Sequence, residues 1–166
     1  MKIANITDTI TKNKVVLSAE VTFKGRKTER MYFSTGIRNK KFIMADASPF
    51  LAAVLLPCMK KRENIIVEGV VSKKLMQNTE KIMELIEGWN IGLKSVDIGV
   101  SRVSPLRQGF AGQAKASAAF FSGGVDSFYT YLKHRKVISE LVFVHGFDIP
   151  LSNASLFQKT KRSIEA

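Results

Sequence analysis

The chain has 166 residues, of which 45% are hydrophobic and 24% charged, enough for one ordinary domain or two small ones with a packed core. Its single cysteine, Cys58, excludes an internal disulfide framework, and its apolar neighbours favour a buried hydrophobic role over a nucleophilic one. The most apolar run, residues 50–59 (FLAAVLLPCM), is too short to span a bilayer, and the first residues lack a signal-peptide core. We therefore expect a cytoplasmic protein without membrane contacts.

The formal net charge of +12 is unevenly distributed, because residues 1–116 hold 20 of the 26 Lys and Arg residues but 10 of the 14 Asp and Glu residues. Such an excess could attract phosphate-rich partners, including RNA. A solvated basic surface is the simpler interpretation, since no RNA-binding signature with interleaved aromatic residues is visible. Both interpretations stay open.

Residues 15–23 (VVLSAEVTF) alternate between apolar and polar, which predicts a half-buried strand, and residues 30–35 (RMYFST) read as the return strand of a hairpin. A helix is expected to begin at Ser48, as the capping residue, with Pro49 at its first position. We expect that helix to kink or stop before Pro57.

Residues 64–71 (NIIVEGVV) predict another strand, after which Ser72 caps an amphipathic helix over residues 73–89. Residues 95–103 (SVDIGVSRV) alternate again and predict a strand. The apolar stripe of the helix consists of Leu75, Met76, Thr79, Ile82, Met83 and Ile86.

The periodicity restarts at residues 116–121 (ASAAFF), which read as a short buried strand. A helix over residues 125–136 and a second apolar strand over residues 140–145 follow, and another helix begins at Ser155. A strand, a helix and a strand at this spacing form a βαβ unit, so the two strands should be parallel.

The fold class expected from these elements is α/β in two parts. Residues 1–103 form an N-terminal, β-rich α+β domain, and residues 104–115, with proline, glycine and glutamine, form a linker. Residues 116–166 form the first part of a parallel-sheet domain.

The loop SGGVDS, residues 122–127, lies where ligands bind in βα units, beyond the carboxyl end of a strand. Gly123 and Gly124 allow backbone amides to approach an anion, the following helix contributes unpaired N–H groups, and Ser122 and Ser127 add hydroxyls. The loop lacks the Gly-Lys-Ser/Thr ending of a Walker A motif and is not GxGxxG. These features predict a cradle for phosphate oxygens.

Asp126 is unusual in such a loop, because a carboxylate repels phosphates. Either it caps the helix, or it reaches a Mg²⁺ ion that a polyphosphate also binds. The sequence leaves both interpretations open.

The loop resembles the PP-loop of the N-type ATP pyrophosphatases, which include asparagine synthetase, GMP synthetase, NAD synthetase and 7-cyano-7-deazaguanine synthase. The matching positions are Ser122, Gly123, Gly124, Asp126 and Ser127, with Val125 at the free position. The resemblance covers roughly residues 116–166, whose sequence is most similar to a bacterial group related to 7-cyano-7-deazaguanine synthase.

The resemblance implies a Rossmann-like domain of the adenine nucleotide alpha hydrolase type that cleaves ATP between its α- and β-phosphates. The adenylyl group would activate a carbonyl or carboxylate of an unidentified small-molecule acceptor. The ATP- and pyrophosphate-binding segment would be residues 122–127, in which Ser122, Gly123, Gly124 and Ser127 hold the departing pyrophosphate and Asp126 helps to place Mg²⁺. No protein nucleophile, and hence no catalytic side chain, is required.

The resemblance also implies that the turn after the second strand receives the adenosine. The residues concerned are His145, Gly146, Phe147 and Asp148. Gly146 would allow close backbone approach, and Asp148 could accept hydrogen bonds from ribose hydroxyls or an amino group. As an alternative, Asp148 is only a turn-forming residue.

Family members have about five parallel strands in this domain, whereas only two are predicted here. We therefore expect an incomplete PP-loop enzyme, to be completed by a C-terminal fragment; a homodimer is the other arrangement considered. An alternative function is an accessory module that binds RNA or another partner and has a non-catalytic nucleotide site. A structural domain in which SGGVDS is only a turn is the third interpretation.

Overall fold

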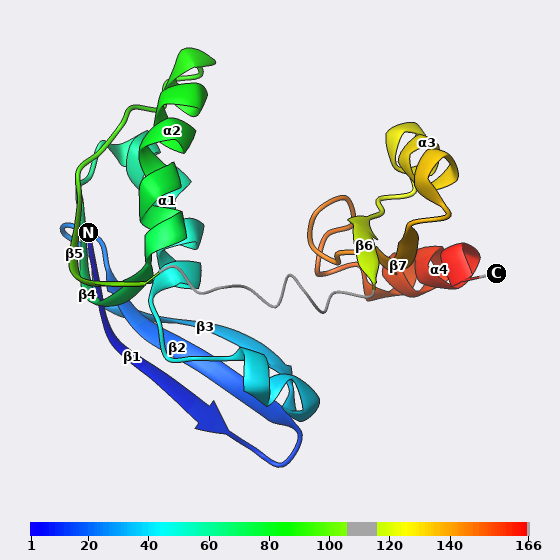
Figure 1. The fold of residues 1–166 in the computed structure, drawn as a ribbon, viewed down its shortest axis with the longest axis horizontal. Helices are drawn as coiled ribbons and strands as arrows, with labels where there is room; N and C mark the ends of the chain where they lie inside the picture. Colours follow the sequence, from blue (N-terminus) through cyan, green and yellow to red (C-terminus); the bar gives the residue numbers. More distant parts are fainter. Residues whose placement is uncertain (106–115, 166) are drawn as a thin grey trace. The chain divides into compact units, whose positions relative to one another are not determined.

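A computed structural model describes residues 1–105 and 116–165 (Figure 1). The chain divides into two compact units, Met1–Arg107 (unit 1) and Gln108–Ala166 (unit 2). Both units combine helices with strands, so the expected α/β class is confirmed at that level. Within the described residues, no helix combines the length and the apolar character needed to cross a membrane.

Unit 1 is built on a five-stranded mixed sheet with the order β3-β2-β1-β4-β5. The β1–β2 and β2–β3 pairs are antiparallel, and the β1–β4 and β4–β5 pairs are parallel. The strands are β1 (Lys2–Ile10), β2 (Lys14–Thr22), β3 (Glu29–Gly36), β4 (Ile65–Ser72) and β5 (Ile98–Ser104). The four strands predicted for this part are confirmed within a few residues at each end, and the central strand β1 was not predicted.

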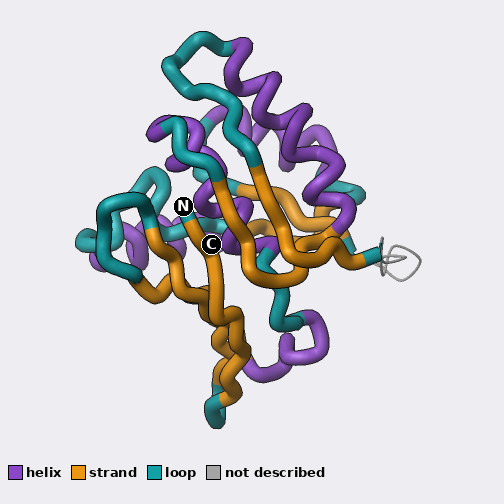
Figure 2. Tube along the Cα trace, turned by 90° about the vertical axis from the view of Figure 1, so that its left-hand side faces the viewer, coloured by secondary structure: helices purple, strands orange, loops and turns teal. Residues whose placement is uncertain are grey.

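The two helices of unit 1, α1 (Ser48–Lys61) and α2 (Lys73–Gly88), lie on one face of the sheet and contribute to one core with it (Figure 1). In Figure 2 the strands of this sheet are orange and the two helices are purple. A 3₁₀ helix, η1 (Ile37–Phe42), follows β3. The core between the helices and the sheet includes Ile3, Leu17, Ala19, Val21, Phe50, Leu51, Val54, Cys58, Met59, Val67 and Met83.

Cys58 is fully buried in this core, which confirms its expected role as a small hydrophobic residue. Burial, with a smaller contribution from the nearby Glu63 carboxylate, raises the pKa of the Cys58 thiol to about 11. The thiolate, which is the reactive form of cysteine, is therefore disfavoured at neutral pH.

The structure corrects two predictions about α1. The N-cap residue is Ala47 rather than Ser48, whose N–H donates to Asp46 Oδ1 at 2.8 Å and whose hydroxyl accepts from the Ser72 N–H at 3.0 Å. The helix also continues through Pro57 to Lys61 instead of ending before it. Ser72 caps α2 as predicted, accepting from the Leu75 N–H at 3.1 Å.

The predicted apolar stripe of α2 is confirmed in most of its length. Thr79 and Met83 are buried. The partly buried residues of the stripe that pack on the core are Leu75, Met76 and Ile86. Ile82 differs, because 38% of its surface is exposed.

Unit 2 contains a two-stranded sheet of β6 (Ser117–Phe120) and β7 (Ile138–Val142), together with α3 (Val125–His134) and α4 (Ala154–Glu165). The strands are parallel, with Phe120 opposite Val142, so the predicted βαβ unit is confirmed. The expected linker begins at the last residue of β5, and its residues 106–115 lie outside the described part of the chain.

The prediction that residues 116–121 form a buried strand is wrong for β6. Only Phe121, just after the strand, is buried, and Phe120 is 76% exposed. The described residues of α3 and α4 likewise include none that are buried. A parallel sheet is normally covered by helices on both faces, and a unit with two strands and two helices has too few elements to do so, which explains this exposure.

Candidate phosphate-binding site

The loop between β6 and α3 is anchored at its first residue. Phe121 is 3% exposed, and its N–H donates to the Val142 carbonyl at 2.9 Å, which ties the loop to the end of β7. Its ring packs edge-on against Phe128 and Tyr131 of α3, with centroid distances of 4.9 and 6.4 Å. The rings therefore fix the direction in which the chain leaves the strand and enters the helix.

The two glycines then have different backbone conformations. Gly123 has a φ of 81°, in the left-handed region that side chains disfavour. Gly124 is extended, with φ −82° and ψ 167°, and it is the N-cap residue of α3. Only Gly123 therefore requires glycine for its backbone, and its conformation turns the chain into the first turn of the helix.

Hydrogen bonds between the two serines and Gly124 shape the loop. The Gly124 N–H donates to Ser122 Oγ at 3.3 Å, and the Ser127 hydroxyl donates to the Gly124 carbonyl at 2.8 Å. That carbonyl also accepts from the N–H groups of Ser127 and Phe128, both at 3.1 Å. The serine hydroxyls are 3.5 Å apart. Loop and helix start thus stabilise each other, as they would in a purely structural turn.

Four backbone N–H groups at this site have no acceptor within the described chain, and they belong to Ser122, Gly123, Val125 and Asp126. All four residues are exposed, so none of these groups belongs to a buried residue. They occupy the start of a ten-residue helix, where the unpaired amides and the helix dipole favour negative charge. This combination suits an anion with several oxygens.

The two hydroxyls differ in how readily they could bind such an anion. The Ser122 hydroxyl makes only the long 3.5 Å contact as a donor, so its proton can turn to a ligand at little cost. Ser127 donates to the Gly124 carbonyl over 2.8 Å and would have to give up that bond. Ser122 is therefore the better anion donor, and Ser127 mainly holds the helix start.

The helix-cap interpretation of Asp126 is wrong, because Gly124 is the N-cap residue and Asp126 lies in the first turn of α3. No hydrogen bond or ion pair engages its carboxylate among residues 1–105 and 116–165. A single carboxylate fits Mg²⁺ that is held mostly by phosphate oxygens and water, which is how Mg²⁺ commonly binds with nucleotides. The described residues contain no cluster of three His, Cys, Asp or Glu side chains that would suggest a closed metal site.

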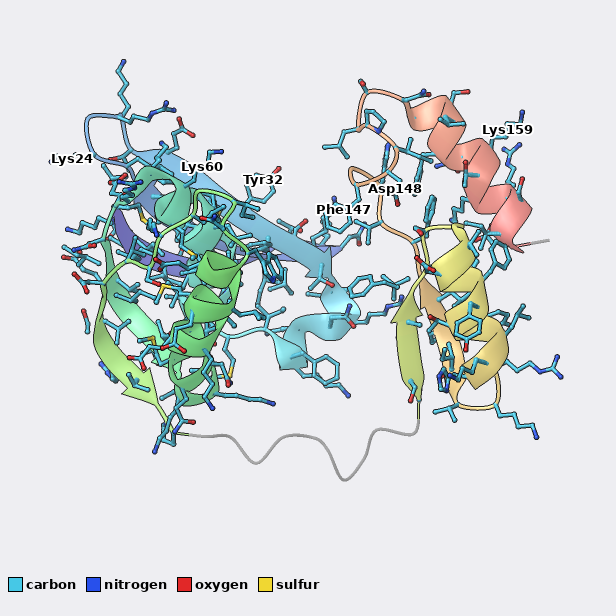
Figure 3. All side chains as sticks on the ribbon, turned by 90° about the horizontal axis from the view of Figure 1, so that it is seen from above. Lys24, Tyr32, Lys60, Phe147, Asp148 and Lys159 are labelled. Carbon is cyan, nitrogen blue, oxygen red and sulfur yellow. The ribbon has the colours of Figure 1, made fainter. Side chains whose placement is uncertain are left out.

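The second predicted segment, residues 145–148, follows β7, and the parallel pairing places its strand end at the same sheet edge as the loop after β6. Phe147 is 80% exposed, and Asp148 is exposed beside it (Figure 3). The Gly146 N–H donates to the Ile149 carbonyl at 2.9 Å. This bond makes the segment a tight turn, which fits the alternative interpretation of Asp148.

Two other residues of this turn are already engaged within unit 2. The His145 ring stacks on Phe157 of α4 at 4.2 Å, and its Nε2 donates to the Pro150 carbonyl at 3.0 Å. Gly146 has a φ of 107°, and a side chain there would lie 3.2 Å from Leu151. Gly146 is thus needed for its close approach to Leu151, and not for the approach of a ligand. The exposed residues of the turn that could contact a ligand are Phe147 and Asp148.

Sequence reasoning missed the ring contacts that position both segments. Phe121 was expected only as the end of a buried strand, and Phe157 was not singled out, although it stacks on both His145 and Phe143. Phe157 lies on a different element from both partners, so no local periodicity points to these contacts. Comparison of the chain with protein-family models, curated proteins and solved structures finds no match.

Proposed function

We propose that unit 2 binds Mg·ATP through residues 122–127 and serves an enzyme that adenylates a carbonyl or carboxylate of a small-molecule acceptor and releases pyrophosphate. The observation that carries the proposal is the set of four unpaired N–H groups of the exposed residues Ser122, Gly123, Val125 and Asp126. Such groups occur at every helix start, and here two glycines beside them leave room for an anion to approach. The PP-loop resemblance supplies the reaction class.

The chemistry follows from where charge develops. When the bond between the α- and β-phosphates breaks, negative charge grows on the leaving pyrophosphate. Backbone N–H groups that are already oriented stabilise this charge without reorganising, and the Ser122 hydroxyl adds a fifth donor. Asp126 would hold Mg²⁺, which supplies further positive charge to the phosphate oxygens.

We also propose that unit 2 is the first part of a larger Rossmann-like sheet. Supporting this, β6 and β7 are parallel, a pairing that proteins normally bury on both faces. Apolar residues of unit 2 are exposed that further strands and helices of a complete domain would cover. They include Val125, which is 85% exposed, Phe120 at 76% and Leu132 at 59%. The mass of the protein isolated from its native cells should therefore exceed 18.5 kDa. A native mass of 18.5 kDa together with ATP-dependent adenylation would contradict this proposal.

Calorimetric titration tests the nucleotide site. The protein should bind Mg·ATP and magnesium pyrophosphate, and it should bind AMP much more weakly, because AMP lacks the two phosphates that the loop would hold. Asp126→Ala and Ser122→Ala should each weaken Mg·ATP binding. Thr130→Ala is a matched control, since it removes an exposed hydroxyl from α3 outside the loop.

Binding of AMP as tight as that of Mg·ATP would place recognition on the nucleoside and contradict the proposed role of the loop. Equal effects of the Ser122→Ala and Thr130→Ala substitutions would do the same. Circular dichroism should show that each variant keeps the helical content of the parent, so that a loss of binding reports on the site.

A further inference from the structure

A dense cluster of cations lies at one end of unit 1, on segments far apart in sequence. We name it the basic end. It contains seven Lys and Arg residues and two acidic residues, Glu29 and Glu63. The cations are Lys24, Arg26 and Lys27 in the β2–β3 turn, Arg30 on β3, and Lys60, Lys61 and Arg62 at the end of α1.

Specific contacts hold the turn against the helix end. The Lys24 N–H donates to Glu63 Oε1 at 2.6 Å, and the Lys61 ammonium lies 4.4 Å from the centroid of the Phe23 ring. The Arg26 N–H donates to the Phe23 carbonyl at 3.0 Å and closes the turn. The cations are therefore gathered on a fixed framework.

The two acidic residues of the basic end leave its seven Lys and Arg side chains with a net excess of five positive charges. Glu63 pairs with the N-terminal ammonium at 2.8 Å. Burial alone would raise the pKa of Glu63, but the hydrogen bonds from that ammonium and from the Lys24 N–H outweigh burial and lower it. No ion pair within residues 1–105 or 116–165 involves any of the seven cations. Like charges held this closely repel one another, which an external polyanion would relieve.

Two adjoining clefts run across the basic end. The first, of about 350 Å³, is lined by Arg26, Lys27, Arg30 and Lys61 together with Phe23 and Tyr32. The second, of about 570 Å³, shares Phe23 and Arg26 and adds Lys24 and Arg62. Tyr32 is 65% exposed, and in Figure 3 it lies along the same side of unit 1 as Lys24 and Lys60.

We propose that the basic end binds the phosphodiester backbone of a single-stranded nucleic acid, with a base stacked on Tyr32. The cations of the two clefts would contact successive phosphates. The exposed ring among them favours an unpaired strand over an acidic protein, because a strand offers bases that stack as well as charge. This site lies in a different unit from the proposed nucleotide site and does not depend on it.

Fluorescence anisotropy of the full chain with labelled twelve-nucleotide U₁₂ RNA and dT₁₂ DNA tests the proposal. A plot of the logarithm of the association constant against the logarithm of the salt concentration should have a slope of about −4, as expected when six cations release counterions from a single strand. Binding of either oligonucleotide supports the proposal, since they share the backbone, and their ratio identifies the preferred sugar.

The triple variant Arg26→Gln/Lys27→Gln/Lys61→Gln should bind at least tenfold more weakly, with a slope shallower by about 2. The matched control, Lys73→Gln/Lys74→Gln/Lys81→Gln, removes the same charge from α2. Lys73 follows the end of β4 and Arg62 precedes its start, so about 25 Å of strand separates the two positions. The control should lose less than threefold.

A second pair of variants tests the stacking. Tyr32→Phe keeps the ring and should bind like the parent, whereas Tyr32→Leu should bind about tenfold more weakly. Asp126→Ala should leave oligonucleotide binding unchanged, which separates this site from the one on unit 2.

The proposal is overturned if neither oligonucleotide binds, or if the two triple variants lose affinity equally. It is also overturned if vesicles with 30% phosphatidylserine bind while both oligonucleotides do not, because the surface then recognises a membrane. Thermal melts of both triple variants should match the parent within a few degrees. If the basic-end triple variant melts at a lower temperature, the double variant Arg26→Gln/Lys27→Gln takes its place. It should bind the oligonucleotides threefold more weakly than the parent, and an affinity equal to the parent's would overturn the proposal.

Discussion

The conformation of Gly123 gives a sharp test of the phosphate site. An alanine at this position would have open space around its methyl group, because nothing lies within 4 Å of the position its Cβ would take. The cost therefore comes from the backbone alone, at a φ of 81°, and amounts to about 1–2 kcal/mol. Since the loop is exposed, Gly123→Ala should relieve this strain by turning to negative φ, which moves the adjacent N–H groups out of the arrangement described above.

The anion-binding conformation then carries that free-energy penalty, so Gly123→Ala should bind magnesium pyrophosphate about 5- to 30-fold more weakly. Gly124→Ala is the control, because a φ of −82° suits alanine and the added methyl would lie 3.4 Å from Ser122 Oγ, an ordinary contact. We expect it to lose about twofold. Calorimetry of both variants provides the measurement, and an equal or larger loss for Gly124→Ala would refute the reasoning.

Three further predictions follow from single side chains. Asp126→Asn should weaken ATP binding when Mg²⁺ is present, because the proposed metal ligand is lost. In EDTA it should strengthen binding, because a carboxylate that repels the phosphates is removed. Titrations in both buffers check this, and equal changes of affinity in the two would contradict it. Cys58 should stay unreactive towards a thiol reagent at pH 8 until denaturant is added, given its pKa of about 11, and rapid labelling of the folded protein would oppose the prediction. Hydrogen bonds from the Ser95 N–H, from Lys94 and from the Ser95 hydroxyl lower the pKa of Glu87 from its ordinary value of 4.5 to about 2. The carboxylate thus stabilises the fold above pH 4.5 and loses that effect as the pH falls towards 2. Glu87→Gln should therefore lower the melting temperature at pH 7 but not at pH 2, and a difference that does not depend on pH would be inconsistent with this.

Most elements of unit 1 could be predicted because their apolar periodicity is regular. In β2, alternate residues face the core, as the pattern of residues 15–23 indicates. The central strand β1 was missed because its period is broken. A register shift between Ala4 and Thr7, with Asn5 at a φ of 51°, brings both Ile3 and Ile6 towards the core despite their spacing of three residues.

Tertiary packing explains why the prediction for Pro57 failed. Proline removes the hydrogen bond to the carbonyl of Ala53, at a cost of about 3 kcal/mol. Both residues are exposed, so water can satisfy that carbonyl. Val54, Cys58 and Met59 lie in the core on either side of the proline, and burying them outweighs the lost bond.

The candidate site was predicted in part. The residue types of SGGVDS identify a strand-to-helix loop with accessible amides, and the structure has that loop. Which N–H groups are open, and how differently the two serine hydroxyls are engaged, depends on the backbone conformations of Gly123 and Gly124. The basic end escaped prediction because its two segments are separated by more than 30 residues and meet only in the fold.

The central claim is that the N–H groups of the β6–α3 loop hold the phosphates of ATP, and two-dimensional ¹H–¹⁵N NMR tests it most directly. On titration with magnesium pyrophosphate, the amide signals of Ser122, Gly123, Val125 and Asp126 should move furthest, because these groups have no acceptor in the described chain. The signals of Ser127 and Phe128 should move less, since both already donate to the Gly124 carbonyl. Saturable shifts centred on the amides of Ser122, Gly123, Val125 and Asp126 are the result we predict. Unchanged signals at these positions, or larger shifts elsewhere in the chain, would contradict the claim.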